Sequence, residues 1–372
     1  MKLKLNLPKI IFLLTTLVFF GASCSQKSDG GIFRTTDGGS TWEQRVFIGQ
    51  EKKKVLSIAN IDIQVIKVDP SNHNVIYLGT KANGIYKTDN GGQVWWKLPI
   101  SSDNIRDIAI DQQYPNNIYA LLGSNIIKST DSGQNWEAVY TDTQNAVITK
   151  IMVDWFNQQK IIATTSIGTV LISENEGADW QVVYQVTEPL NGIEMSQTDS
   201  RIIYVLELDE SLHKTTDGGL TWTDLFTENP QFEAFKKENK TSNVNEVKNM
   251  AMDPNNSNVL YVVTSEGIIK TLDGGRTWNL LDTLIAQGAE ENSNIRRLVV
   301  LPGDSNTIFF TINNLIHKTT DGGLTWKTIE DFPSQRIINN LYIDSNDTNI
   351  MYAGMQSIPK KGWGFFGAPA TK

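Results

Sequence analysis

Short apolar runs alternate with polar turn segments along most of the chain. In the clearest example, the run Ile66–Val68 leads into the turn Asp69–Asn72, and a second apolar run, Val75–Leu78, follows. Related segments occur at 108–119, 250–261 and 341–352. Apolar runs of this length bounded by Pro, Asn and Asp predict β-strands joined by tight turns. The pattern therefore predicts pairs of strands that recur along the chain.

A second repeated element is a nine-residue stretch. Lys214-Thr-Thr-Asp-Gly-Gly-Leu-Thr-Trp222 recurs letter for letter at 318–326, and five altered copies bring the total to seven. The acidic residues of the copies are Asp37, Asp89, Asp131, Glu174, Asp217, Asp273 and Asp321. The tryptophans are Trp42, Trp95, Trp136, Trp180, Trp222, Trp278 and Trp326. Steps of 42 to 56 residues between acidic positions indicate an array of supersecondary units.

The residue types in this stretch suit a turn between two strands. The Asp carboxylate can accept hydrogen bonds from backbone N–H groups just ahead of it, and the glycines permit a positive φ angle. The Trp that follows is a large apolar wedge at the start of the outgoing strand, with one indole N–H to satisfy. The stretch therefore predicts an anchored structural turn with no catalytic role.

Each repeat thus contains two strands, a link, a third strand, the repeated turn and a fourth strand. Four-stranded units of this period build an all-β propeller. The first unit has only its later part, 31–47, whereas 336–353 supplies an opening strand pair. We therefore expect the C-terminal strands to complete the N-terminal blade and close a ring of seven blades within 31–372. Residues 362–366 could instead form the third strand of an eighth unit, so a ring of eight blades is the alternative.

The stretch resembles the Asp-box (BNR) repeat, Ser/Thr-x-Asp-x-Gly-x-Thr-Trp. The copies that begin at 35, 215, 271 and 319 fit this pattern. The copy 174–180 has Glu for Asp, and the copy 89–95 is read with one extra residue. The resemblance implies a β-propeller, a fold shared by sialidases, xyloglucanases, sortilin ectodomains and photosystem II assembly factors, so it does not specify one function. In the single-propeller photosystem II factors, which are the most similar in size and export, the propeller binds a membrane-protein precursor.

The N-terminus predicts export. Three lysines precede an apolar run, Ile10–Phe20, and then Gly21-Ala-Ser-Cys24, the only cysteine. This arrangement resembles a bacterial lipoprotein signal, with 1–23 removed, Cys24 acylated and 24–30 forming a tether to the membrane. Gly21 departs from the Leu or Val usual at that position. An ordinary secretory signal or an uncleaved anchor are the alternatives.

Charge limits the possible partners. The chain has 41 acidic and 33 basic residues, which argues against a nucleic-acid binder. A cation nevertheless precedes six of the seven turns, and the series is Arg34, Lys87, Lys128, Lys214, Lys270 and Lys318, with Ile172 in the remaining unit. These residues could form a ring that binds an anionic partner, or they could be solvated residues whose stems cover the neighbouring Trp.

Three long insertions are expected on the face opposite the repeated turn, at Gly49–Asn60, Phe226–Glu246 and Thr283–Asn294. Long loops on a rigid scaffold are common binding elements. The predicted partner contacts in the middle insertion are Phe232, Phe235, Lys236, Lys237 and Lys240. Trp155, at a turn position that holds Pro elsewhere, is expected to be exposed and could serve as a ligand platform.

Catalytic signatures are missing from the sequence. None of the eight arginines begins the Arg-Ile-Pro signature of sialidases, and no carboxylate pair can be assigned to glycoside hydrolysis. His213 and His317 occupy strand positions that are aromatic or apolar in other units, and Asp344–Asn349 is expected to be a turn and not a calcium loop. We expect no metal and no cofactor.

The sequence therefore predicts a monomeric, lipid-anchored, extracytoplasmic scaffold that binds a protein partner. The alternatives are an exported glycan-binding or glycoside hydrolase-like propeller and a purely structural surface protein.

Overall fold

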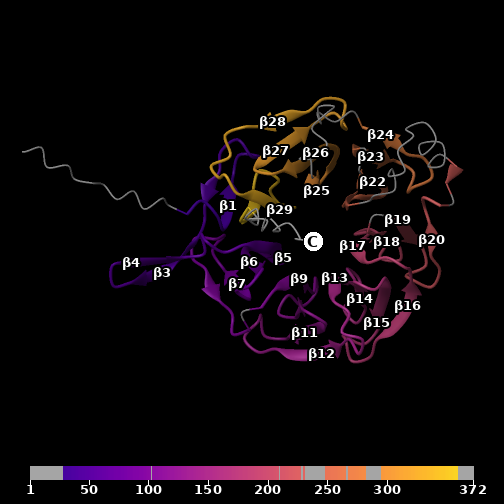
Figure 1. Cartoon of the computed structure of the whole chain (residues 1–372), viewed down its shortest axis with the longest axis horizontal. Coiled ribbons are helices and arrows are strands. Elements are labelled where there is room, and N and C mark those ends of the chain that lie inside the picture. The colour runs from indigo at the N-terminus through magenta and orange to yellow at the C-terminus, as the bar shows by residue number, and fades with distance from the viewer. Residues whose placement is uncertain are drawn as a thin grey trace, which may run out of the picture.

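Seven four-stranded antiparallel sheets surround a central axis (Figure 1). The computed structural model describes residues 28–101, 103–208, 210–227, 229–230, 248–264, 267–281 and 295–358. The predicted signal peptide and Cys24 lie outside these ranges. Within them, no helix is both long and apolar enough to cross a bilayer. The prediction of an all-β propeller with seven blades is confirmed.

The strands of each blade are given from the axis outward. Blade 1 contains β29 (Ile337–Ile343), β30 (Met351–Gln356), β1 (Ile32–Thr35) and β2 (Glu43–Gln44). Blade 2 contains β5 (Ile63–Asp69), β6 (Asn72–Thr80), β7 (Ile85–Thr88) and β8 (Trp96–Lys97). Blade 3 contains β9 (Ile105–Ile110), β10 (Ile118–Leu122), β11 (Asn125–Ser129) and β12 (Glu137–Thr141). Blade 4 contains β13 (Ile148–Val153), β14 (Ile161–Thr165), β15 (Thr169–Ser173) and β16 (Gln181–Gln185).

The remaining blades follow the same order. Blade 5 contains β17 (Leu190–Met195), β18 (Ile203–Glu207), β19 (Ser211–Thr215) and β20 (Thr223–Asp224). Blade 6 contains β21 (Asn249–Asp253), β22 (Asn256–Thr264), β23 (Gly267–Thr271) and β24 (Asn279–Leu280). Blade 7 contains β25 (Ile295–Leu301), β26 (Asp304–Ile312), β27 (Leu315–Thr319) and β28 (Lys327–Ile329). A separate hairpin joins blades 1 and 2 and consists of β3 (Phe47–Glu51) and β4 (Lys54–Ser57).

The ring closes through strands from both ends of the chain. β1 pairs antiparallel with β30, with Phe33 opposite Ala353 and Thr35 opposite Met351. Because β29 and β30 thereby belong to blade 1, they do not begin an eighth blade among the described residues. The predicted closure between N- and C-terminal strands is confirmed.

The hydrophobic core lies between neighbouring blades. One buried cluster joins Tyr204 and Leu212 of blade 5 to Met252, Leu260 and Trp278 of blade 6. Because each sheet packs against a neighbour on both faces, the middle strands are apolar on both sides. This packing explains the continuous apolar runs of the sequence.

The repeated turns and the turns between the first two strands of each blade lie on the same face. In blade 1, the Gly38 N–H donates to the Asn349 carbonyl at 3.0 Å. In blade 5, the Gly218 N–H donates to the Arg201 carbonyl at 3.0 Å. The links from the outer strand of one blade to the inner strand of the next therefore lie on the opposite face, which we call the insertion face.

Hydrogen bonds within the first repeated turn show the function of its residues. Asp37 Oδ1 accepts from the Thr35 hydroxyl at 2.7 Å and from the Thr41 N–H at 2.9 Å, while Oδ2 accepts from the Thr41 hydroxyl at 2.6 Å. Gly38 and Gly39 have φ angles of 68° and 94°, which only glycine adopts without strain. The Trp42 indole N–H donates to the Gly39 carbonyl at 3.1 Å. The turn thus binds its own backbone.

Two of the seven copies differ from the prediction. In blade 2 the Val94 N–H donates to Asn90 Oδ1 at 3.0 Å, and in blade 4 the Asp179 N–H donates to Asn175 Oδ1 at 2.8 Å. The assignment of Asp89 and Glu174 to this position is therefore wrong by one residue, and the copy in blade 2 has no extra residue. An asparagine oxygen accepts the same N–H bond as a carboxylate, so the turn keeps its geometry.

The cations before the turns pack on aromatic rings. The charged groups lie 5.1 to 5.8 Å from the ring centroids of the facing strand-two residues, which are Tyr352, Tyr77, Tyr119, Tyr204, Tyr261 and Phe309. Lys214 Nζ also donates to the Gly274 carbonyl of the next blade at 2.9 Å. Burial lowers the pKa of Lys214 and Lys270. The expectation of solvated stems covering Trp is wrong, and these cations connect structural elements within the ring.

The Asp turns predict acid sensitivity. Hydrogen bonds from Thr41 and Thr35 lower the pKa of Asp37 to about 2, and those from Asn135 and Ser129 lower the pKa of Asp131 to about 2. Because these pKa values lie below those of the unfolded chain, the stabilisation is complete above about pH 4 and is lost as pH falls towards 2. We expect the Asp37→Asn protein to fold, because Asn90 occupies the same turn position in blade 2. The difference in free energy of unfolding between wild type and this variant should shrink between pH 4 and pH 2. Urea denaturation followed by Trp fluorescence at several pH values measures this; a difference independent of pH contradicts it.

Candidate functional site

A central channel is lined by the first strand of every blade. One cavity of about 450 Å³ occupies the half towards the insertion face, and a second of about 660 Å³ occupies the other half. Residues that line both include Lys67, Trp155, Glu194 and Arg297. The two cavities therefore share walls along the axis of the ring.

The inner strands present polar residues at matching positions. At the mouth of the channel on the insertion face, each blade contributes one polar residue at or near the start of its inner strand. We call these residues the mouth tier, and they are Gln64, Arg106, Thr149, Asn191, Lys248, Arg296 and Asn339. The next tier contains Asp107, Lys150, Asn249, Arg297 and Asn340 in five of the blades. Bulges in the pairing at Ile148/Lys150 and Ile295/Arg297 lie at these two tiers. A bulge re-aims side chains, which allows adjacent residues to face the channel.

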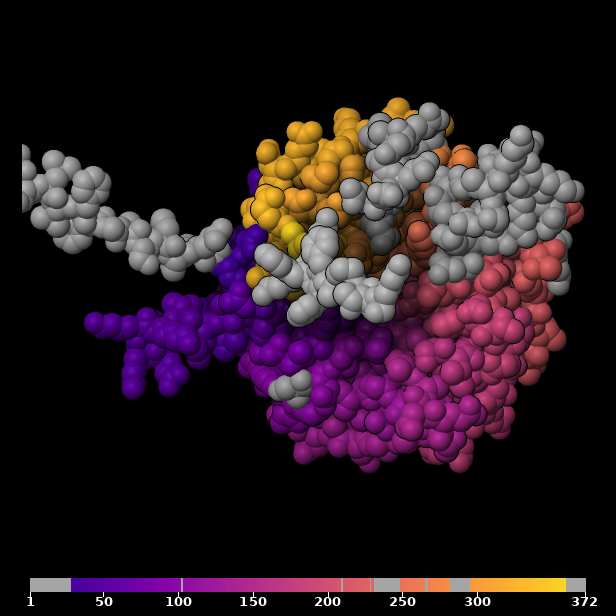
Figure 2. All heavy atoms as spheres, viewed as in Figure 1, coloured from indigo at the N-terminus to yellow at the C-terminus, as the bar shows by residue number. Residues whose placement is uncertain are grey.

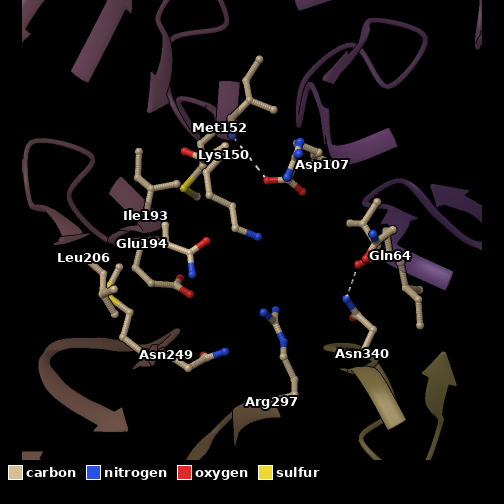
Figure 3. A pocket seen from close by; sticks show the side chains of 18 of the residues that line it. Gln64, Asp107, Lys150, Met152, Ile193, Glu194, Leu206, Asn249, Arg297 and Asn340 are labelled. Atoms are coloured by element: carbon tan, nitrogen blue, oxygen red, sulfur yellow. Dashed lines mark hydrogen bonds between the residues drawn. The ribbon is translucent and has the colours of Figure 1, made fainter. Parts of the chain in front are cut away.

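Charged side chains of opposite sign gather inside the channel (Figure 3). Figure 3 shows Lys150 and Arg297 pointing towards each other from opposite walls, with Glu194 beside them. Asp107 lies nearby and is buried. Its carboxylate accepts from the Ile108 N–H at 3.0 Å and the Ile151 N–H at 3.4 Å, and it lies 3.7 Å from Lys67 Nζ. Asp107 is therefore engaged by the channel wall.

Lys150, Arg297 and Glu194 differ from Asp107, because their side chains form no hydrogen bond or ion pair with another described residue. Asp107 favours the charged form of Lys150, but burial together with Arg297 and Lys67 outweighs it and lowers the pKa of Lys150. Burial raises the pKa of Glu194, although Arg297, Lys67 and Lys150 partly oppose this shift. The channel therefore disfavours charge on both groups.

Two buried donors in the channel also lack acceptors. The Arg297 Nε–H and the Trp155 Nε1–H have no partner in the part of the chain that the structure describes. The mouth tier adds three further cations, so the lining of this half contains six basic and two acidic residues. This local excess of positive charge contrasts with the net charge of −8 for the whole chain.

A second feature is the β3–β4 hairpin, which projects from the ring (Figures 1 and 2). Val55 and Phe47 are 60% and 40% exposed, and the tip contains Lys52, Lys53 and Lys54. At its base, the Trp95 N–H donates to the Phe47 carbonyl at 2.8 Å. The predicted insertion Gly49–Asn60 is therefore a hairpin anchored on blade 2.

The N-terminal segment lies at the base of the same hairpin. The Ser28 hydroxyl donates to the Ala59 carbonyl at 2.6 Å. Arg336 Nε donates to Asp29 Oδ1 at 3.3 Å, and the Gln335 N–H donates to Asp29 Oδ2 at 2.9 Å. The segment before β1 is thus held between the hairpin and the link from blade 7 to blade 1.

Comparisons with known proteins agree with this architecture. Residues 124–237 match the family model described as Sortilin-Vps10, sortilin, neurotensin receptor 3. The solved structure "YCF48 bound to D1 peptide" is 16% identical with a TM-score of 0.59, and the alignment covers 80% of this chain and 94% of that one. YCF48 from Cyanidioschyzon merolae is 10% identical, with coverages of 79% and 95% and a TM-score of 0.60.

The chain is an Asp-box β-propeller. It is also similar to the GH74 xyloglucanase from Xanthomonas campestris, at 13% identity and a TM-score of 0.63. That alignment covers 85% of this chain and 52% of the xyloglucanase, so this propeller spans about half the length of the enzyme. No curated protein sequence matches significantly. At these identities the structural likeness shows the fold alone.

The propeller places one predicted ligand residue differently from expectation. Trp155 is half-buried, packs against the core between blades 4 and 5, and lines the channel. The expectation of an exposed platform is therefore wrong. The other predicted partner contacts, Phe232, Phe235, Lys236, Lys237 and Lys240, lie outside the described residues, as do most of the second and third insertions.

The histidines of the propeller have local partners. Buried His213 contacts Glu207 Oε2 through Nε2 at 2.9 Å and the Tyr184 hydroxyl through Nδ1 at 3.1 Å. His317 stacks on Phe310 and contacts the Thr328 hydroxyl at 3.0 Å. No group of three or more potential metal ligands occurs among the described residues.

The engagement of Asp107 can be tested by its stability cost. We expect Asp107→Ala to destabilise the propeller by about 2 kcal/mol, because it removes acceptors from buried N–H groups and leaves Lys67 unpaired. Exposed Asp103 provides the control, and Asp103→Ala is expected to change stability by less than about 0.5 kcal/mol. Urea denaturation at pH 7 compares them, and equal effects would refute the structural role of Asp107.

Proposed function

We propose that the propeller is an exported, lipid-anchored scaffold that binds a protein partner through a surface that includes the β3–β4 hairpin at the rim of the ring. The observation that carries this proposal is the position of the β3–β4 hairpin, whose base contacts the N-terminal segment at Ser28. A projecting hairpin with exposed apolar and basic residues suits a protein contact more than a small-molecule site. The structural neighbour titled "YCF48 bound to D1 peptide" supports a polypeptide partner.

Acylation of Cys24 would place this contact close to the membrane. Four residue steps separate Cys24 from Ser28, and an extended chain spans about 3.5 Å per residue, so the tether reaches about 14 Å. The hairpin base and the start of the tether therefore stay near the lipid surface. A partner embedded in the membrane, or projecting from it, is consequently favoured over one that diffuses freely. Phe232 and Phe235, in the middle insertion, remain a second predicted contact.

The glycan-active alternative gains no support from the channel. The carboxylates that line its described walls are Asp107 and Glu194, and Asp107 is bonded to backbone N–H groups. Glycoside hydrolysis requires two carboxyl groups free to act on one glycosidic bond. The scaffold is therefore the function that we propose.

The anchor can be tested with Cys24→Ser. We expect this variant to shift the protein from the membrane fraction to the soluble extracytoplasmic fraction, because it lacks the sulfur that carries the lipid. Ser25→Ala is the matched control and should remain in the membrane fraction. Fractionation followed by intact-mass measurement checks both; a membrane-bound Cys24→Ser protein without added lipid mass would exclude lipid anchoring at this residue.

The partner surface can be tested by photocrosslinking in cells. We expect a photoreactive amino acid at Val55 to give a reproducible protein adduct, because this exposed side chain lies on the projecting hairpin. The matched control is Leu324, which is 80% exposed on the opposite face. Mass spectrometry identifies the adducts. Adducts at Leu324 alone, or only lipid adducts at Val55, would contradict partner binding through the hairpin.

A further inference from the structure

We propose that the channel contains a binding site for a compact oxyanion, a carboxylate or phosphate group, held between Lys150 and Arg297. This proposal depends only on the channel and not on the lipid anchor or the hairpin. Both side chains point into the space between them in Figure 3. The surrounding cavity, of about 450 Å³, is large enough for a small organic anion or for an acidic side chain.

The first argument is the imbalance of charge. Lys67, Lys150 and Arg297 converge in one narrow channel, and Lys67 is paired with Asp107. Glu194 is the remaining carboxylate of the described lining, so one positive charge is left without a counter-charge at this level. Like charges held together in a partly desolvated space repel one another strongly, and a bound anion relieves this repulsion.

The second argument is the imbalance of hydrogen-bonding groups. Lys150 Nζ, Arg297 Nε and Trp155 Nε1 are donors, and none has an acceptor among the described residues. The amides of the same tier are engaged, since Asn249 Nδ2 donates to the Arg296 carbonyl at 3.2 Å and Asn340 Nδ2 to the Gln64 carbonyl at 3.1 Å. A ligand rich in acceptors satisfies this surplus, whereas a cation or an amine adds to it.

The third argument concerns the class of anion. Guanidinium and ammonium groups bind carboxylate and phosphate oxygens through short, charge-assisted bonds. Trp155 is the aromatic residue in the described lining of this half, and part of its surface packs against the core between blades 4 and 5, so the described lining holds no extended aromatic platform for a sugar or base. The three cations of the mouth tier, Arg106, Lys248 and Arg296, attract an approaching anion.

The site can be tested by titrating the soluble mature protein with inorganic phosphate, acetate and succinate, with sodium chloride at equal ionic strength as the reference. We expect at least one anion to bind saturably by calorimetry and to raise the melting temperature above the chloride reference. Arg297→Gln should weaken binding at least about tenfold, because one charge-assisted interaction contributes about 1.5 to 3 kcal/mol. Glu194→Gln should tighten binding, since it removes a repelling carboxylate.

Matched variants control for net charge and folding. Lys327→Gln removes one exposed positive charge from β28, the outermost strand of blade 7, and should leave anion affinity unchanged. Lys150→Arg keeps the channel charge and should retain binding that Lys150→Gln loses. The same titration with a short acidic peptide, blocked at both ends, identifies the source of the oxyanion. Binding of that peptide alone assigns the site to an acidic side chain. A response that follows ionic strength only, or that is equal in wild type and Arg297→Gln, overturns the proposal.

Discussion

A blade of this propeller can bury both of its faces only between two neighbours, and this requirement governs the rest of the structure. Every buried cluster joins residues of adjacent sheets, as Tyr204 of blade 5 and Trp278 of blade 6 illustrate. An open row of blades would leave two apolar faces in water, whereas a ring leaves none. The pairing of β1 with β30 is therefore what allows all seven interfaces to form together.

The outer and inner parts of each blade experience different constraints. At the periphery, the repeated turn satisfies its own backbone, and cations such as Lys214 bond the next blade, so these positions hold similar residues around the ring. At the axis, the inner strands face a channel and need only keep alternate side chains apolar. Residues such as Lys150, Glu194 and Arg297 therefore differ from blade to blade, and this freedom permits a specific site on a repetitive scaffold.

Much of the fold could be predicted from the sequence because the turn residues repeat. The period, the glycine pairs and the tryptophans predict seven blades and their closure. The errors had two sources, a substituted acceptor within the local turn and packing between blades. Asn90 and Asn175 replace the expected carboxylate because an amide oxygen accepts the same N–H bond. Trp155 occupies a turn position in the sequence, yet its ring packs between blades.

The channel site could not be predicted because its residues come from different repeats. A signal was nonetheless present, since the mouth tier is polar in all seven blades, with Arg106 and Arg296 among its residues. Recognising it requires the repeats to be aligned on their inner strands and not on the Asp-box turn. The position of Lys150 opposite Arg297 across the channel depends on the ring geometry and therefore required the structure.

The closure of blade 1 also sets an order for folding during synthesis and export. β1 and β2 emerge first, but β30, which pairs with β1, and β29, which pairs with β30, lie about three hundred residues later in the chain. Contacts of such high sequence separation form late, and until then β1 presents an unpaired edge that can pair with another chain. The open edge of β1 is consequently covered only after β30 has been synthesised. A chain truncated before β29 therefore loses two strands and also exposes the edge of β1 that β30 would cover.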